Sequence, residues 1–290
     1  MAVEQNGPWG RTAAVESYFP QDVGSELTAR CRTAGGRLTL IRRPGIHADP
    51  RTGPRRCYLA WSGPKAFLLV GRVDHPAELL GDAFDALARG DRDGVLAALP
   101  QLTASEPVLL VCTNGRHDVC CAIRGRPVAL AGHERHPGRV WECSHTGGHR
   151  FSPTGVLLPW GRALARLDSD AVTHTLDAAD AGRLAPGVLG PWHDRGSSAY
   201  PPRVQVGESA VRELVGETDL EALTARAIAP LEVAVVHRDG REWIVALSVV
   251  EGERRRNSCG EPEEPARTWT ATVTQRPRVG AHGDASSRAP

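Results

Sequence analysis

Several features that would assign this sequence to a broad class are absent from it. No apolar run approaches the roughly 20 residues that span a bilayer, so no transmembrane helix is expected. The formal net charge is only +1, which gives no overall field toward nucleic acid or an anionic membrane. Lys65 is the only lysine, and the arginines are spread along the chain instead of clustering with aromatic residues. We therefore expect neither nucleic acid nor membrane among the partners.

Further absences bear on compartment and cofactor. Residues 1–10 lack a basic region followed by an apolar core, so we expect no signal peptide and predict a cytoplasmic protein. No Gly-rich dinucleotide fingerprint occurs, which argues against bound NAD or flavin. No paired carboxylates stand in a context that suggests glycoside hydrolysis.

The seven cysteines are odd in number, which argues against a disulfide framework in a chain without an export signal. Four of them fall within residues 112–143, and this uneven distribution is the first indication of function. Three cysteines lie far from that group and are expected to be inert buried thiols: Cys31, Cys57 and Cys259.

Hydrophobic patterning predicts an α/β protein with a polar entry segment over residues 1–30. The expected elements up to residue 104 are strands at 37–41, 57–61 and 66–70 and helices at 76–88 and 94–99. A new unit begins near Ser105, with a strand at 108–111, a helix at 119–131, a strand at 139–143 and a hairpin of 156–158 with 162–167. Beyond it, the pattern predicts helices at 168–184, 204–215 and 219–227, a loop at 186–202, and a hairpin of 231–237 with 242–250.

The first motif runs from Cys112 to Cys121 with the sequence CTNGRHDVCC. Cys112 comes where a buried strand is predicted to end, and Cys121 falls in the first turn of the next helix, behind Asp118 as a plausible N-cap. These positions can bring two thiolates to one metal, and the free N–H groups of the helix N-terminus stabilise anionic sulfur.

The second motif runs from Cys143 to Phe151 with the sequence CSHTGGHRF. Two glycines between His145 and His149 permit a tight turn that could direct both imidazoles to one ion. Arg150 could neutralise nearby charge, and Phe151 could exclude water.

Two cysteines and two histidines leave two kinds of metal site open. A structural Zn²⁺ site with Cys₂His₂ ligands is common, but its cysteines usually stand two to four residues apart, whereas Cys112 and Cys121 are nine apart. A [2Fe–2S] cluster needs two ligands on each iron, and histidines replace two cysteines on one iron in Rieske centres. The residues alone do not decide between the two.

The two motifs resemble the sucrase/ferredoxin-like family, whose Apd- and Aim-type members are bis-histidinyl thioredoxin-like ferredoxins. The resemblance lies in Cys112–Cys121 and in Trp141–Phe151, and it is looser at Gly7–Gly10 and Ser258–Gly260. This sequence departs from the family at Asn114 and Ser152, neither of which is a candidate ligand.

The resemblance implies a [2Fe–2S] cluster bound by four residues: Cys112, Cys121, His145 and His149. It implies that the cysteines hold one iron and the histidines the other. It also implies an electron-transfer protein, an electron carrier rather than a catalyst, with an unidentified redox donor and acceptor.

The expected organisation combines the pattern with this resemblance. Residues 1–104 are predicted to form an N-terminal α/β domain and residues 105–275 a thioredoxin-like ferredoxin domain that carries the cluster site. Residues 276–290 are polar and rich in Gly, Ser and Pro, so we expect a disordered tail.

Two other functions stay open. One is a zinc-stabilised Cys₂His₂ binding module, and the other is a thiol oxidoreductase that uses Cys120 or Cys121. The Cys-x-x-Cys spacing of such oxidoreductases is absent, which argues against the latter.

The other polar and thiol residues near the motifs have simpler interpretations. Cys120 and Cys143 are expected to be buried thiols near the site, and Asp118 a helix cap. His117 is expected to be a solvated loop residue, and His133 and His136 surface residues.

Overall fold

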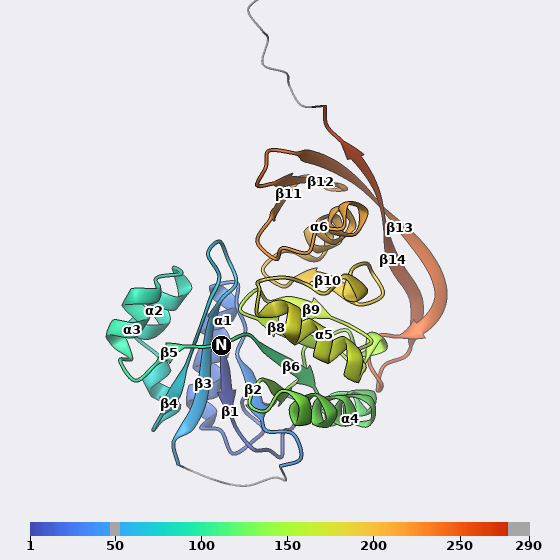
Figure 1. The fold of residues 1–290 in the computed structure, drawn as a ribbon. Helices are drawn as coiled ribbons and strands as arrows, with labels where there is room; N and C mark the ends of the chain where they lie inside the picture. The colour runs from blue at the N-terminus through green and yellow to red at the C-terminus, as the bar shows by residue number, and fades with distance from the viewer. Residues whose placement is uncertain (47–52, 278–290) are drawn as a thin grey trace, which may run out of the picture.

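A ten-stranded mixed sheet forms the body of the protein, and a separate four-stranded antiparallel sheet follows it near the C-terminus (Figure 1). The structure is a computed structural model that describes residues 1–46 and 53–277. In spatial order, the larger sheet consists of β10 (Asp194–Ser197), β9 (Arg162–Leu164), β8 (Gly155–Leu158), β6 (Val108–Cys112), β7 (Val140–Cys143), β2 (Thr39–Arg42), β1 (Ala2–Glu4), β3 (Arg55–Trp61), β4 (Phe67–Val73) and β5 (Thr103–Ala104). The predicted α/β class is confirmed in this form.

Helices cover the two halves of this sheet with separate cores. The α-helices are α1 (Gln21–Thr33), α2 (Asp82–Ala88), α3 (Arg92–Ala98), α4 (Val119–Arg135), α5 (Ser169–Ala179) and α6 (Pro202–Val215), and the short 3₁₀ helices are η1 (Pro76–Leu79), η2 (His149–Phe151) and η3 (Pro186–Val188). Buried apolar residues of α1, α2 and α3 pack with β1 to β4, whereas α4 and α5 pack with β6 to β9. Each half of the sheet thus buries one apolar face under its own helices.

Strand β6 is the central element of the second half. All five of its residues are buried, as expected for a continuous apolar run between two neighbouring strands. It pairs parallel with β7 and antiparallel with β8, and α4 connects β6 to β7. The predictions for β6, α4, β7 and the β8–β9 hairpin are confirmed, with α4 reaching Arg135 instead of ending at 131.

The two halves share one sheet because β2 pairs antiparallel with β7. The register sets Ile41 opposite Cys143 and Arg42 opposite Glu142. The segment 1–30 is not simply a polar entry segment, since β1 lies inside the sheet between β2 and β3. The sheet therefore continues across residue 104, and the division into domains there stays a prediction.

Three other predicted elements differ from the structure. Residues 219–227 were expected to be helical, but Leu223–Ala229 form strand β11, whose burial alternates and which pairs with β12 (Glu232–His237). Alanine favours helix, but pairing with β12 and the burial of alternate side chains outweigh that local preference here. The loop at 186–202 contains η3 and the edge strand β10, and the helix expected at 76–88 is divided into η1 and α2.

The four-stranded sheet ends in a long hairpin. Its order is β11, β12, β13 (Glu242–Arg256) and β14 (Glu263–Gln275), so the predicted hairpin of 231–237 with 242–250 is confirmed and β13 extends further. Helix α6 packs on this sheet through Val204, Val211 and neighbouring apolar residues. The β13–β14 hairpin curves from the top of Figure 1 down the side of the molecule toward α4. Most of the predicted tail, 278–290, lies outside the described residues.

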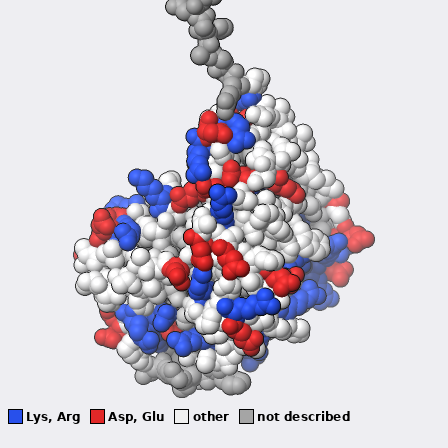
Figure 2. All heavy atoms as spheres, in the orientation of Figure 1, with Lys and Arg blue, Asp and Glu red and all other residues white. Residues whose placement is uncertain are grey.

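No helix within residues 1–46 and 53–277 is both long and apolar enough to cross a bilayer. Acidic and basic side chains are mixed over the face seen in Figure 2, in line with the net charge of +1. Neither sign dominates that face.

A buried ion-pair network joins the larger sheet to helix α6, which packs on the smaller sheet. The Arg162 guanidinium of β9 donates to Asp194 of β10 and, at 2.5 Å, to Glu208 of α6. Glu208 also accepts from Arg212 Nε at 2.9 Å. These side chains are almost completely buried and have lost their hydration. Only the opposite charges and hydrogen bonds of their partners compensate for that loss.

The substitution Glu208→Ala should therefore destabilise the protein strongly, since it leaves two buried guanidinium groups without this carboxylate. Breaking a buried pair costs about 3–5 kcal/mol. Glu213→Ala, which removes an exposed carboxylate from the same helix, is the matched control and should cost little. Urea unfolding followed by circular dichroism measures both, and equal midpoints for the two variants would contradict the assignment.

Candidate metal centre

The end of β6 and the start of α4 bring two cysteines together. Cys112 is the last residue of β6, and Cys121 lies in the first turn of α4. Both side chains are fully buried. The close approach of helix and strand depends on Gly125, where an added Cβ would lie 2.2 Å from the Cys112 carbonyl oxygen. Only glycine fits at that distance.

The loop after β7 supplies the third candidate ligand. His145 Nδ1 lies 3.9 Å from Cys112 Sγ, and one ligand atom each of Cys112, Cys121 and His145 falls within 4.8 Å of the others. Gly147 and Gly148 take φ values of +95° and +68°, so the predicted tight turn with unusual backbone angles is present. Sequence reasoning thus identified three residues that the fold brings together.

The fourth predicted ligand, His149, begins η2, but its side chain lies outside what the structure describes. Its role as a ligand stays a prediction. The backbone around it is held in place, because Phe151 N donates to Gly148 O at 2.8 Å and Arg166 N donates to Phe151 O at 2.8 Å.

His117 is closer to the centre than the sequence analysis expected. Its ring stacks on the His145 ring, with centroids 3.6 Å apart and planes 4° apart, and 24% of its side chain is exposed. His117, Asp118 and His145 also form a second group of possible ligands within 4.8 Å. The expectation of a solvated loop residue is therefore met only in part, because His117 lies in a loop but packs against His145. The signal available in the sequence was its place beside Asp118 inside the first motif.

Asp118 occupies the N-cap position of α4, but its side chain makes no capping hydrogen bond to that helix. Its Oδ1 instead accepts from Ser258 Oγ at 2.8 Å and from Cys259 N at 2.7 Å. Its Oδ2 lies 3.0 Å from His117 Nδ1 and 3.8 Å from His145 Nδ1. The carboxylate therefore serves the histidines and the hairpin tip instead of the helix N-terminus.

The two cysteines of the centre share protons as a pair. Hydrogen bonds from Cys121, from His145 and from the backbone of Thr146 and Asn114 hold the pKa of Cys112 well below its usual range. The pKa of Cys121 is raised, first because its thiol donates to Cys112 and then because it is buried. A metal ion would replace the proton that Cys121 donates, since thiolates are the metal-binding form.

The remaining cysteines fall into two groups. Cys31, Cys57 and Cys143 are buried, as expected, and burial raises the pKa of each. Cys143 is the register partner of Cys112 and belongs to the same apolar cluster. Cys120 and Cys259 are only half-buried, so the predictions that they are buried thiols are met only in part.

Segments far away in the chain support the two ligand loops. The Arg42 guanidinium donates to Glu142, which also accepts from Thr113 Oγ1 at 2.8 Å, directly after Cys112. Asn114 Nδ2 donates to Gly10 O at 3.1 Å, which connects the Gly7–Gly10 turn to the first motif. Arg37 Nη1 donates to Thr146 O at 2.9 Å in the second motif.

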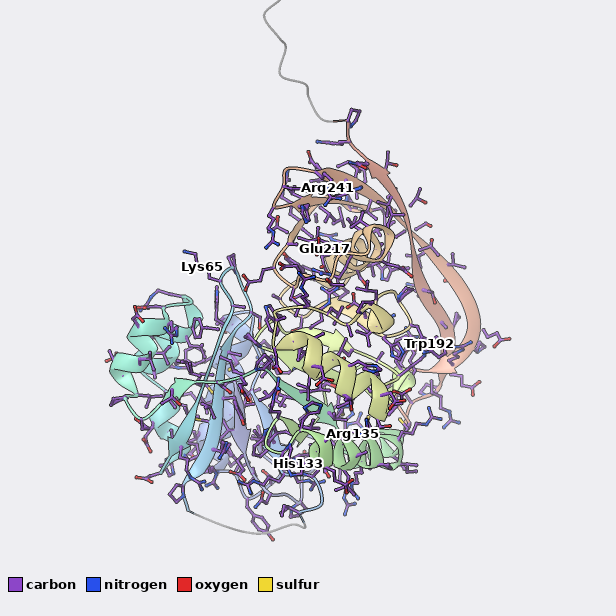
Figure 3. The ribbon with its side chains drawn as sticks, in the orientation of Figure 1. Lys65, His133, Arg135, Trp192, Glu217 and Arg241 are labelled. Carbon is purple, nitrogen blue, oxygen red and sulfur yellow. The ribbon has the colours of Figure 1, made fainter. Side chains whose placement is uncertain are left out.

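Positive charge gathers beside the second motif. The guanidinium groups of Arg150, Arg166 and Arg195 all lie within 4.8 Å of the Phe151 ring centroid. Burial and the two neighbouring arginines lower the pKa of Arg195. Arg166 also stacks on Trp192, which Figure 3 places on the side of the molecule that carries the β13–β14 hairpin. Such a group favours negative charge nearby.

His133 and His136 belong to the opposite end of α4. Figure 3 shows His133 near Arg135, where the helix ends. Both histidines are half-buried, so the expectation of surface residues is met only in part.

The donor set of the centre is soft and sheltered from water. Two buried sulfur atoms and a partly exposed imidazole suit Zn²⁺ or an iron–sulfur cluster better than Mg²⁺ or Ca²⁺, which prefer oxygen ligands. The residues present therefore fit a metal or a cluster with cysteine and histidine ligands.

Replacing Gly125 with alanine should disorganise this centre, because the added Cβ would meet a backbone carbonyl that cannot turn away. We expect about 1–3 kcal/mol of destabilisation and weaker metal binding. Gly187→Ala is the control, since its added Cβ would meet nothing within 4 Å. Metal content after purification, together with thermal unfolding, tests the prediction. Full retention of metal by the Gly125 variant would show that the close contact does not position Cys112.

Comparison with known proteins agrees with the two motifs. No curated protein matches the chain, and no solved structure matches it either. The family model of sucrase/ferredoxin-like proteins matches residues 37–187, which is more than half of the chain and includes both motifs. The chain belongs to the sucrase/ferredoxin-like family.

Proposed function

We propose that the protein binds a [2Fe–2S] cluster and transfers electrons. The observation that carries the proposal is the meeting of Cys112, Cys121 and His145, with ligand atoms within 4.8 Å of each other, in a chain of a ferredoxin-like family. His149, four residues after His145, is the proposed fourth ligand. When bound, such a cluster accepts and releases single electrons.

The proposed division of the ligands between the two irons is the one that the family resemblance implies. Cys112 and Cys121 come from β6 and α4, whereas His145 and His149 come from the loop after β7. The two cysteines would hold one iron and the two histidines the other. Because Cys112 and Cys121 are fully buried, the apolar cluster around them would limit the access of water to the iron that they hold.

The arrangement of elements supports a thioredoxin-like ferredoxin fold as part of this proposal. Parallel β6 and β7 are joined by α4, and the antiparallel strands β8 and β9 follow on the other side of β6 before α5. In that fold, β6 and α4 would be the first strand and the first helix. Cys112 and Cys121, at the junction of β6 and α4, would then lie where a thioredoxin-like fold carries its reactive residues.

The redox donor and acceptor are also proposals. Arg150, Arg166 and Arg195 stand beside the histidine loop and would attract an acidic partner surface. Zinc in the same site is the second candidate, because three ligand atoms this close to one another also suit a single ion.

Anaerobically purified protein should be brown, with iron and acid-labile sulfide in equal amounts, whereas a colourless protein with one zinc would favour the second candidate. Cys112→Ser and Cys121→Ser should each lose the visible absorption, because each removes a ligand. Cys57→Ser is the control, since Cys57 is buried in the N-terminal core. Retention of the full spectrum by Cys121→Ser would contradict the ligand assignment.

The midpoint potential should fall as pH rises. Histidine ligation can couple the uptake of a proton to that of an electron, and one proton per electron corresponds to about 59 mV per pH unit. His145→Cys removes one of the proposed histidine ligands and should lower the slope. Voltammetry between about pH 6 and pH 10 measures it. A potential that does not change with pH would contradict the role of the histidines.

A further inference from the structure

The β13–β14 hairpin carries a second cysteine pair to the edge of the candidate centre. Its two strands span Glu242–Arg256 and Glu263–Gln275, and the tip between them holds Ser258 and Cys259. In Figure 1 this hairpin leaves the smaller sheet and descends toward α4. The tip thereby meets residues about 140 positions earlier in the chain.

Three contacts set the position of the tip. Ser258 Oγ and Cys259 N both donate to Asp118 Oδ1, at 2.8 and 2.7 Å. Ser258 is buried, although residues 248–256 of β13, which lead to it, are exposed. The third contact joins Cys259 Sγ to Cys120 Sγ at 3.7 Å. The sulfur atoms touch but are farther apart than the roughly 2.05 Å of a disulfide bond.

Accessibility separates this pair from the other cysteines. All seven cysteines lie in the described part of the chain, and only Cys120 and Cys259 are not buried. Cys121 faces Cys112 inside the apolar cluster, so a small oxidant in solution meets Cys120 and Cys259 first. The sequence analysis considered Cys120 or Cys121 as a reactive thiol but did not pair either with Cys259.

We propose that Cys120 and Cys259 form a reversible disulfide that fastens the hairpin tip to the metal centre. The oxidant is a low-molecular-weight disulfide. The Cys259 thiolate attacks one sulfur of this molecule and releases one thiol, which leaves a mixed disulfide on Cys259. The Cys120 thiol then loses its proton as its sulfur attacks Cys259 Sγ; the bond between the two protein sulfurs forms, the mixed disulfide breaks, and the departing thiolate takes up the proton and leaves as the second thiol. In balance, two protein thiols become one disulfide, and the small disulfide becomes two thiols.

The disulfide would change the freedom of the tip. In the reduced protein, two hydrogen bonds to Asp118 and the contact between sulfurs hold it, and such exposed elements open locally at low cost. In the oxidised protein a covalent bond adjoins Cys121, so the tip cannot leave the N-terminal end of α4. Asp118, which faces His117 and His145, would then continue to accept the hydrogen bonds that Ser258 and Cys259 donate.

The test is oxidation of the full-length reduced protein with glutathione disulfide, followed by alkylation, proteolysis and mass spectrometry without reductant. The expected result is a crosslinked peptide that contains Cys120 and Cys259, with a loss of two hydrogen atoms from the chain. Cys259→Ser should abolish this crosslink, and Cys31→Ser, a substitution in the N-terminal core, should leave it unchanged.

A stable glutathione adduct on wild-type Cys259, a crosslink through Cys121, or no reaction would each overturn the proposal. Hydrogen exchange gives a second measurement that does not depend on a variant, because the amides of 257–260 should exchange at least about tenfold more slowly after oxidation. Both experiments are performed on the protein with and without bound metal. Absence of iron would contradict the proposed function alone, whereas absence of the crosslink would contradict this proposal alone.

Discussion

One buried carboxylate connects the parts of this protein that meet at the candidate centre. Asp118 is 1% exposed, and a carboxylate withdrawn from water must receive hydrogen bonds or face positive charge. Its Oδ1 accepts from Ser258 and Cys259 of the hairpin tip, and its Oδ2 lies 3.0 Å from His117 Nδ1 of its own loop and 3.8 Å from His145 Nδ1 of the loop after β7. Hydrogen bonds to this one carboxylate thus hold the tip of a hairpin that lies about 140 residues later in the chain.

The larger sheet explains why the ligands come from neighbouring elements. Parallel strands end at the same edge, so the ends of β6 and β7 carry Cys112 and Cys143 as register partners, with His145 two residues later. The N-terminal part of the chain contributes β2 directly beside β7, and Arg42 stabilises Glu142 and Thr113 from there. The centre therefore rests on residues from both halves of the sheet, and the second half supplies the ligand atoms.

Local pattern predicted those elements whose burial is uniform or strictly periodic. The apolar run at Val108–Val111, the helix after Asp118 and the β12–β13 hairpin all appear where the residues indicate them. Residues 219–227 were wrongly predicted as a helix, because their alanines favour helix locally, whereas pairing with β12 makes Leu223–Ala229 a strand. The short edge strand β10 was missed for a different reason: its glycine and serine are typical of a loop.

The residue types of the centre were readable in the sequence because thiols and imidazoles in two compact, glycine-containing motifs have few purely structural uses. Cys112, Cys121 and His145 were identified in this way, and family resemblance, not spacing, favoured iron–sulfur over zinc. The stacking of His117 on His145 and the approach of Cys259 to Cys120 could not be read from the chain. Those contacts join residues 28 and 139 positions apart. They arise from strand register and from the curvature of a long hairpin, which local propensity does not encode.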